Sequence, residues 1–280
     1  MKRAGGLFEQ VCTWDNLRLA ARKASRGKRS SPAVQHFNER LEWNLVRLQE
    51  ELSTDRWHPG RYTEFHIYEP KQRLISAAPF PDRVVHHAVM NVLEPVFEPA
   101  FSHDSYACRV GKGTHAAANR FTHYCRRLDY VLKADIRKYF PSIDHEILHG
   151  LLARKLKDSK MLRLLKRIID GSNPQEPMPH YFPGDDLFTP HERRPGIPIG
   201  NLTSQFFANV YLNGLDHFVK GVLQIPGYVR YCDDFALFAD DKEELWTAKS
   251  AAEEYLAGLR LKLHPGKCHL QPVTVGTTFV

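Results

Sequence analysis

Three aspartates are the residues of this sequence whose type and spacing could do chemistry. Asp233 and Asp234 are adjacent, at the point where two apolar strands over residues 228–239 are expected to fold back on each other. Asp135 ends another short apolar run at 131–136. A lone pair of aspartates fits an ordinary polar turn better than a site. A third carboxylate at the end of a buried strand favours a charged site, where a cation must offset the repulsion.

Carboxylates are the ligands that a hard cation such as Mg²⁺ prefers, whereas His and Cys suit softer metals. Two magnesium ions about 3.5–4 Å apart can activate a hydroxyl nucleophile, orient a triphosphate and stabilise the departing pyrophosphate. We therefore expect Asp135, Asp233 and Asp234 to hold two Mg²⁺ ions, for which Mn²⁺ can substitute. Asp240 and Asp241 form a second acidic pair, but they follow a strand and precede a helix, so we expect them to cap that helix.

A glycine-containing turn precedes an apolar helical stretch at residues 196–209. Gly196 and Gly200 have no side chains, so the backbone there can lie close to a flat ligand such as a base pair. The segment lacks the G-x-x-x-x-G-K-[ST] pattern of a phosphate loop. Taken alone, the turn is explained equally well as the start of a helix.

Hydrophobic periodicity predicts the elements that must position these residues. Apolar steps of three and four predict helices over 34–52, 84–96 (with Asp82 as N-cap), 144–156, 159–170, 205–219 and 242–259. Alternation predicts a hairpin over 63–77, strands within 131–136 and 228–239, and the start of a strand at 261–263. The proline-rich stretch 171–196 is expected to be irregular. Strands and helices mix without a regular βαβ rhythm, which predicts an α+β fold rather than a doubly wound sheet.

The composition limits the class of protein. The chain has 280 residues, a formal charge of +7 and 42% hydrophobic residues, which is typical of a globular protein and excludes wholesale disorder. The basic excess favours a polyanionic partner. The basic run at 22–29 fits either a solvated loop or a contact with a phosphate backbone. We expect neither a membrane span nor a signal peptide.

Cysteine and histidine usage argues against soft-metal and disulfide chemistry. The five cysteines are an odd number, and none lies in a C-x-x-C pair. This pattern predicts neither a disulfide framework nor a structural zinc site, and it indicates a reducing compartment. The fifteen histidines include no H-E-x-x-H motif, so we expect most of them to be surface or packing residues.

Three motifs in a fixed order resemble a known family. They read D-I-R-K-Y-F-P-S-I-D at 135–144, G-I-P-I-G-N-L-T-S-Q at 196–205 and Y-C-D-D-F-A-L-F at 231–238. This order resembles reverse transcriptases of the group II intron-like lineage. It is most similar to those of diversity-generating retroelements, because I-G-x-x-x-S-Q at 199–205 replaces the usual Q-G-x-x-x-S-P. The similarity extends to residues 7–12, 68–80 and 104–115.

The resemblance implies roles for individual residues at the reacting centre. Asp135 and Asp233 would be the main magnesium ligands, and Asp234 would be the weaker third carboxylate. Lys267, in L-K-L-H-P-G-K, matches a lysine that protonates the departing pyrophosphate. These residues would make up the catalytic set.

The resemblance also implies residues that bind nucleotide and template. The nucleotide-binding set would be Lys71, Arg73, Ile136, Phe140, Ile199, Gly200 and Gln205, and the template-binding set would be Arg109 and Lys112. Phe140 matches the aromatic gate that excludes a 2′-hydroxyl, and Lys71 and Arg73 match cations that grip the triphosphate. Ile199 stands where most relatives have a glutamine, so discrimination at the nascent base pair is expected to be loose, with errors opposite template adenines.

The implied fold is the fingers and palm of a right-hand polymerase, with an antiparallel palm sheet and packed helices. Residues 1–60 would form a basic helical extension, 61–130 the fingers, and 131–280 the palm, with a fingers-like insertion around 157–195. The family continues into a helical thumb that grips the duplex. We expect the thumb to be absent or truncated here, because the sequence given ends at Val280.

The expected function is RNA-directed DNA synthesis. The partners would be an RNA template, a DNA or RNA primer and deoxynucleoside triphosphates, with a small basic accessory protein by resemblance alone and no membrane. The resemblance also implies a cytoplasmic protein that is prokaryotic or phage-encoded. Two alternatives stay open: a reverse transcriptase of a retron or other antiviral defence system, and a nucleic-acid-binding scaffold with little catalysis. The complete set of three aspartates, aromatic gate and triphosphate cations argues against the scaffold.

Overall fold

The computed structural model describes residues 3–68, 72–171, 180–276 and 279. The chain forms two compact units, each assembled from separate segments of the sequence. The first comprises Met1–Ala100, His145–Gln175 and Gly196–Gln205, and the second comprises Phe101–Asp144, Glu176–Pro195 and Phe206–Val280. The predicted mixture of helices and antiparallel strands is confirmed.

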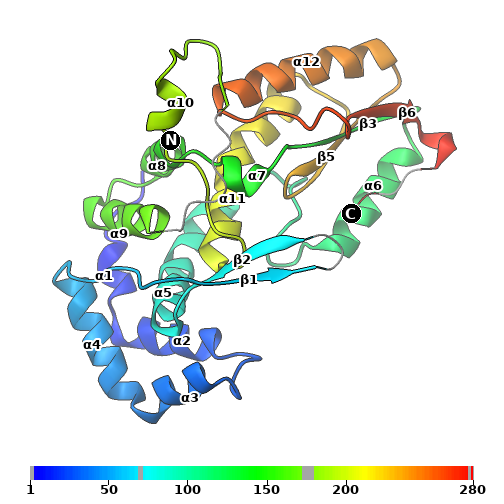
Figure 1. Cartoon of the computed structure of the whole chain (residues 1–280). Coiled ribbons are helices and arrows are strands. Elements are labelled where there is room, and N and C mark those ends of the chain that lie inside the picture. The colour runs from blue at the N-terminus through cyan, green and yellow to red at the C-terminus, as the bar shows by residue number, and fades with distance from the viewer. Residues whose placement is uncertain (1–2, 69–71, 172–179, 277–278, 280) are drawn as a thin grey trace. The chain divides into compact units, whose positions relative to one another are not determined.

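The first unit is mainly helical, with one β-hairpin. Its elements are α1 (Phe8–Val11), α2 (Trp14–Ala24), α3 (Pro32–Glu39), α4 (Leu41–Ser53), β1 (Thr63–Ile67), β2 (Arg73–Ala77), α5 (Phe80–Phe97), η1 (Glu98–Ala100), α8 (His145–Lys155) and α9 (Ser159–Asp170). α2 packs against α5 (Figure 1). Their contact includes a hydrogen bond from Asn16 Nδ2 to the Ala88 carbonyl at 3.0 Å.

The single helix predicted over 34–52 is two helices. The chain leaves helical geometry at Arg40, with φ −129° and ψ 45°, between α3 and α4. Asn44 Nδ2 donates to the Phe37 carbonyl at 2.9 Å, which satisfies a carbonyl at the end of α3. The apolar spacing continues across the break because both helices bury one face, so periodicity alone cannot reveal it.

The predicted N-cap role of Asp82 is also wrong. α5 begins at Phe80, with Pro79 as its N-cap and Pro81 at one of the first helical positions, where proline is favoured, so Asp82 lies inside the first turn. The Asp82 carboxylate instead accepts from the Gly60 amide at 2.7 Å. Burial raises the pKa of Asp82 to about 6.

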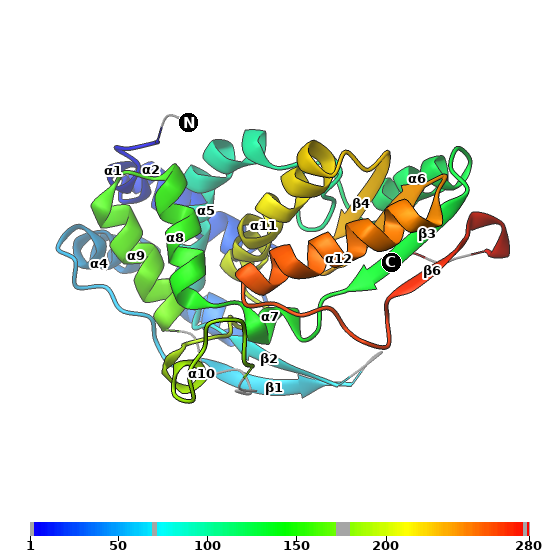
Figure 2. The ribbon, with the colours of Figure 1, turned by 90° about the horizontal axis from the view of Figure 1, so that it is seen from above.

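The second unit is built around a four-stranded antiparallel sheet. Its elements are α6 (Thr114–Cys125), β3 (Tyr130–Asp135), α7 (Tyr139–Ser142), α10 (Thr189–Glu192), η2 (Phe218–Val222), β4 (Gly227–Tyr231), β5 (Asp234–Ala239), α12 (Lys242–Gly258), β6 (His269–Pro272) and η3 (Val273–Val275). α11 (Leu202–His217) begins in the first unit and continues into the second. The strand order is β4-β5-β3-β6, and α12 packs against β3 and β5 (Figure 2).

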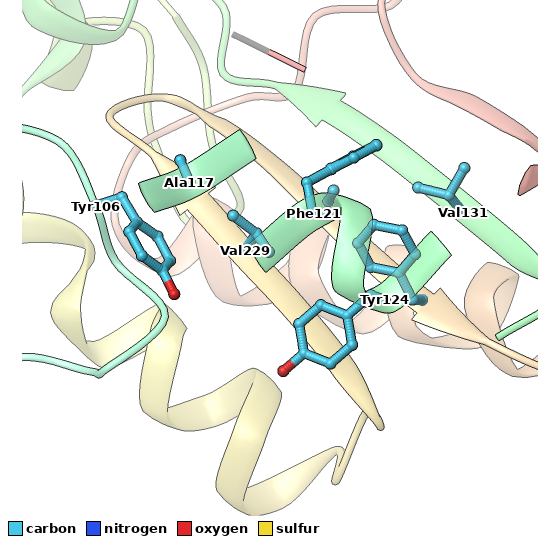
Figure 3. Close-up of a cluster of buried hydrophobic side chains, with 8 residues drawn as sticks. Tyr106, Ala117, Phe121, Tyr124, Val131 and Val229 are labelled. Carbon is cyan, nitrogen blue, oxygen red and sulfur yellow. The ribbon is translucent and has the colours of Figure 1, made fainter. Parts of the chain in front are cut away.

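A cluster of buried side chains fixes α6 on one face of this sheet. Phe121 of α6 meets Phe238 of β5 edge to face at 5.0 Å, beside Val131 and Val229 (Figure 3). Leu132, which points to the opposite face of β3, is buried as well. Both faces of the sheet are therefore covered along the middle of the strands, and Asp135 and Asp234 lie at the ends of their strands.

Two further predicted boundaries differ from the structure. The strand expected at 261–263 is only an isolated pairing of Leu263 with Ile136, and the strand that joins the sheet is β6. α11 starts at Leu202 rather than at residue 205, and the chain continues past His217 as a π-helical turn. Pro265 and Gly266 follow the isolated pairing, which explains why the strand cannot continue there.

The predicted positions of several elements are confirmed. α9 spans the predicted 159–170, and α12, the β1–β2 hairpin and the β4–β5 hairpin lie where the patterns placed them. All five cysteines are free. Over the described ranges, no helix is both long enough and apolar enough to cross a bilayer.

Candidate active site

The three predicted carboxylates meet at one end of the second unit's sheet. In the antiparallel register of β3 and β5, Asp135 lies directly opposite Asp234. Asp233 lies in the two-residue loop that joins β4 to β5. The amide of Ile136 donates to the Asp233 carbonyl at 3.2 Å, which ties this loop to the end of β3. Pairing of β3 and β5 therefore places all three side chains in one small region.

Charge repulsion and desolvation shape the electrostatics of this region. Burial raises the pKa of Asp233, and the charge of Asp135 raises it further. The pKa of Asp234 is raised to about 6, because its carboxylate is partly withdrawn from water and faces the charges of Asp233 and Asp135. Both raised pKa values mean that ionising these carboxyls costs more free energy here than in water. A bound cation would lower that cost.

Lys267 supplies one positive charge to the cluster. Its ammonium lies 2.5 Å from Asp135 Oδ2, and this hydrogen bond raises the pKa of Lys267. Two backbone hydrogen bonds hold the segment of Lys267 beside Asp135. The amide of His264 donates to the Asp135 carbonyl at 2.8 Å, and the amide of Lys267 donates to the His264 carbonyl at 3.2 Å. The predicted catalytic residues are thus brought together.

Asp135, Asp234 and Lys267 line a groove of about 310 Å³. Lys133 and His269 also line it, together with Phe279, and neither basic residue was predicted for the site. A sequence signal for Lys133 exists, because it stands two residues before Asp135 and therefore points to the same face of β3. His269 pairs with Lys133 in the sheet. No local sequence pattern predicts that His269 lies at this site, because β6 and β3, which pair in the sheet, are far apart in the sequence.

The donor set fits magnesium in kind, because it consists of carboxylates alone. Over the part of the chain that the structure describes, no group of three or more His, Cys, Asp or Glu side chains is placed so that the protein alone could hold a metal ion, and this includes the three aspartates. Magnesium sites of phosphate-transferring enzymes commonly take one or two carboxylates from the protein and complete their coordination with substrate phosphates and water. A magnesium ion at these aspartates would therefore need substrate phosphate and water to complete its coordination.

The residues after β3 are fixed mainly by backbone contacts and by Tyr139. Lys138 adopts a left-handed conformation with φ 45°, and it precedes the short helix α7. The hydroxyl of the buried Tyr139 donates to the Ala208 carbonyl at 2.6 Å. The half-buried Phe140 contacts the Tyr139 ring edge to face at 5.6 Å. Ile136 is buried, so its contribution to the site is its main-chain amide.

The two predicted template-binding cations fold back on their own segment. Arg109 Nη1 donates to the carbonyls of Ser102 at 2.5 Å and Ser105 at 2.8 Å. Lys112 Nζ donates to the His103 carbonyl at 2.8 Å and lies 4.8 Å from the centre of the Tyr106 ring. The structure therefore shows both residues shaping the 102–112 loop of the second unit, and their contact with a template stays a prediction.

The remaining predicted nucleotide-binding residues lie in the first unit. The amide of Ser76 on β2 donates to the Ile199 carbonyl at 3.1 Å, which pairs the glycine-containing turn with the strand that begins at Arg73. Gly200 has φ 112°, and a Cβ there would approach Ile75 to 2.9 Å, so this position requires glycine. Gln205 is exposed, and Lys71 lies outside the described residues.

The basic run at 22–29 borders a groove in the first unit. Arg18 and Arg22 of α2 line it together with Arg29, which follows that helix, and the volume is about 570 Å³. The alternative in which this run contacts a phosphate backbone therefore has a concave, arginine-lined surface available to it, and the choice between the two alternatives stays open.

Comparison with known proteins agrees with these features. The chain matches the reverse transcriptase (RNA-dependent DNA polymerase) family over residues 68–276. It is 26% identical to the group II intron-encoded protein LtrA of Lactococcus lactis subsp. cremoris, over 64% of this chain and 28% of that protein. It is 24% identical to the protein YkfC of Escherichia coli K12, over 89% of this chain and 74% of that protein.

A plant protein is similar too. The mitochondrial nuclear intron maturase 1 of Arabidopsis thaliana is 24% identical over 59% of this chain and 29% of that protein. The matches to LtrA and to this maturase thus cover less than a third of either relative. The family match covers most of this chain, including β3, β5 and their aspartates. The chain therefore belongs to the reverse transcriptase (RNA-dependent DNA polymerase) family.

Proposed function

We propose that this chain synthesises DNA on an RNA template by two-metal nucleotidyl transfer. The observation that carries the proposal is the meeting of Asp135, Asp233 and Asp234 at one end of the sheet, with Lys267 on Asp135. The second unit would carry the palm strands, and the β1–β2 hairpin would belong to the fingers. The substrates would be an RNA template, a primer and deoxynucleoside triphosphates.

The proposed reaction is an in-line displacement. The primer 3′-hydroxyl loses its proton to water, its oxygen forms a bond to the α-phosphorus of the nucleotide, and the bond from that phosphorus to the pyrophosphate oxygen breaks. Asp135, Asp233 and Asp234 would hold Mg²⁺, which lowers the pKa of the 3′-hydroxyl and neutralises the developing charge. The ammonium of Lys267 would give its proton to the departing pyrophosphate. Its hydrogen bond with Asp135, one of the proposed magnesium ligands, supports this role.

Primer extension on an RNA template with Mg²⁺ tests this proposal. Asp233→Asn keeps the shape of the side chain but removes its charge, so extension should fall by at least about 100-fold, because metal charge stabilisation contributes several kcal/mol. Asp241→Asn is the matched control, because asparagine caps a helix about as well as aspartate does. It should extend within about twofold of the parent. A parent chain without extension, or equal rates in the two variants, would contradict the proposal.

We further propose that the polymerase belongs to the diversity-generating type and copies template adenines with errors. The support is the I-G-x-x-x-S-Q motif at 199–205, in which Ile199 stands in place of a glutamine. An apolar side chain offers no hydrogen bond to the nascent pair, so correct and incorrect nucleotides would differ less in binding free energy.

Ile199→Gln tests the source of the errors. Misincorporation opposite adenine should fall about 2- to 10-fold, the ratio that one net hydrogen bond of about 0.5–1.5 kcal/mol supports. Ile199→Leu keeps the residue apolar and should leave the error rate unchanged. Unchanged errors in the glutamine variant would place the infidelity elsewhere in the site.

A further inference from the structure

Arg230 is a fully buried cation with no role in the proposed reaction. It lies on β4, two residues before Cys232, and its side chain is sealed from water. Arg230 Nε and Nη2 donate hydrogen bonds to the buried carboxylate of Asp216 on α11, at 2.6 Å and 2.7 Å. The hydroxyl of Tyr228 donates to the same carboxylate at 2.7 Å. This two-pronged pairing compensates the buried charge.

The rest of the guanidinium reaches the carboxylate loop and the 102–112 segment. Nη1 donates to the Cys232 carbonyl at 2.9 Å, and Nη2 donates to Ser105 Oγ at 3.0 Å. Nη1 also lies 3.3 Å from Asn209 Oδ1. The Arg230 main chain bonds the same segment, because its amide donates to the Asp104 carbonyl at 2.8 Å. A single planar group thus joins α11, the Asp233-bearing loop and the segment of Arg109.

The loop that Arg230 contacts is unfavourable in isolation. Cys232 has φ 58°, a left-handed conformation that a non-glycine residue rarely adopts. The neighbouring Asp233 and Asp234 repel each other and Asp135. Such a conformation persists only where the surroundings determine it. Two contacts do so here: Arg230 on the Cys232 carbonyl and the Ile136 amide on the Asp233 carbonyl.

We propose that Arg230 is a positioning residue for the reaction. It holds the Cys232–Asp233 loop in the conformation that presents Asp233 beside Asp135, and Asp216 fixes the guanidinium for that task. This inference rests on the proposed function, because the aligned carboxylates are the predicted metal ligands. The competing explanation is that Arg230 only neutralises Asp216 and fills space in the core.

Arg230→Lys and Tyr228→Phe separate these explanations. Lysine keeps the charge beside Asp216 but has no planar fork to reach Cys232 and Ser105 at the same time. Phenylalanine removes one hydrogen bond to Asp216 and leaves the loop contact intact. In primer extension, kcat of the lysine variant should fall about 10- to 100-fold, because misplacement of reacting groups by about 1 Å has that effect. KM for the nucleotide should change little, the Mg²⁺ concentration for half-maximal rate should rise, and Tyr228→Phe should stay near the parent in all three.

A second readout needs neither metal nor activity. Amide hydrogen exchange in EDTA, followed in peptides that cover residues 135–139 and 229–236, reports on the Ile136 amide and on the loop. Arg230→Lys should speed exchange there and leave α6 and α12 as protected as in the parent. Tyr228→Phe should not speed exchange in these peptides. Unchanged exchange in the lysine variant would overturn the inference.

A triple variant covers the case in which Arg230→Lys fails to fold. Arg230→Met with Asp216→Leu, made in a Tyr228→Phe background, removes both buried charges and the hydroxyl that would be stranded, a replacement that is often neutral for stability. It should fold, exchange rapidly at the loop and extend primers poorly. Full extension by this variant would show that Arg230 serves only the core. If the parent itself does not extend, the proposed function fails, and the exchange comparison alone then decides the role of Arg230.

Discussion

Strand β5 has an aspartate pair at each end, and the two pairs behave differently. Asp233 and Asp234 at its start face Asp135 across the sheet, and the pKa of each is raised by desolvation and by the neighbouring charges. After its end, Asp241 caps α12 by accepting from the Glu243 amide at 3.0 Å. Asp240 accepts from the Asp129 amide at 3.1 Å.

The difference shows that the environment gives the same dipeptide its role. At the end of β5, backbone amides satisfy each carboxylate, and the charges face solvent and the start of a helix, where negative charge is favourable. At its start, three carboxylates converge and one lysine ammonium offsets only part of their charge. One pair therefore stabilises the fold, whereas the other is retained at a cost to stability.

The largest expected effect on activity comes from replacing Lys267, the lysine beside the carboxylates at the start of β5. Lys267→Met should lower kcat for primer extension by about 100-fold or more, because a positioned proton donor typically contributes about 10²–10⁴-fold. KM for the nucleotide should change much less. Lys262→Met is the matched control: Lys262 lies in the same segment, over the Phe182 ring at 5.1 Å, and should be dispensable. A Lys267→Met enzyme within twofold of the parent would remove Lys267 from the mechanism.

A substitution in the second pair, Asp240 and Asp241, should lower the stability of the protein without changing its activity. Asp241→Ala removes the cap of α12, which typically costs about 1 kcal/mol and should lower Tm by about 2–4 °C. Extension measured well below that Tm should match the parent. Thermal unfolding followed by circular dichroism gives the first quantity and the primer assay the second. A large loss of extension without a change in Tm would mean that the two pairs are not separate in function.

Local sequence signals predicted the parts of the fold that local interactions determine. α9 was predicted at its observed bounds, because the Asp158 carboxylate caps it and Gly171 ends it. The β4–β5 hairpin was predicted from two apolar runs around a short polar turn. The aspartates were picked out because they end these strands. Their convergence follows from the pairing of β3 with β5.

Long-range contacts account for what the sequence did not reveal. The break at Arg40 leaves the apolar spacing intact, and β6 joins the sheet through residues far from β3 in the chain. Arg230 resembled an ordinary strand residue, since its partner Asp216 lies on another element. A charged residue in an otherwise apolar strand was a usable signal, because a buried cation requires a buried partner.

The smallest expected effect concerns the pH dependence of the first pair. The pKa of Asp234 is about 6 in the folded chain against an ordinary value of 3.8, so the folded state binds the proton more tightly than the unfolded state does. Between about pH 4 and pH 6 the unfolded state loses its proton first, so this carboxyl lowers stability progressively as pH rises, and the loss is complete above pH 6. Asp234→Asn should therefore be more stable than the parent at pH 7.5 and equal to it near pH 4.

The gain should be small, on the order of 1 °C in Tm, because Asp234 is partly exposed and water screens its charge. The measurement is thermal unfolding in EDTA at a series of pH values, with Asp241→Asn as the control, which should show no pH-dependent gain over the parent. EDTA matters because a bound cation would stabilise the charged carboxylates and hide the difference. An Asp234→Asn variant that is less stable than the parent at pH 7.5 would mean that this carboxylate supports the fold, as Asp241 does, and the contrast between the two ends of β5 would be lost.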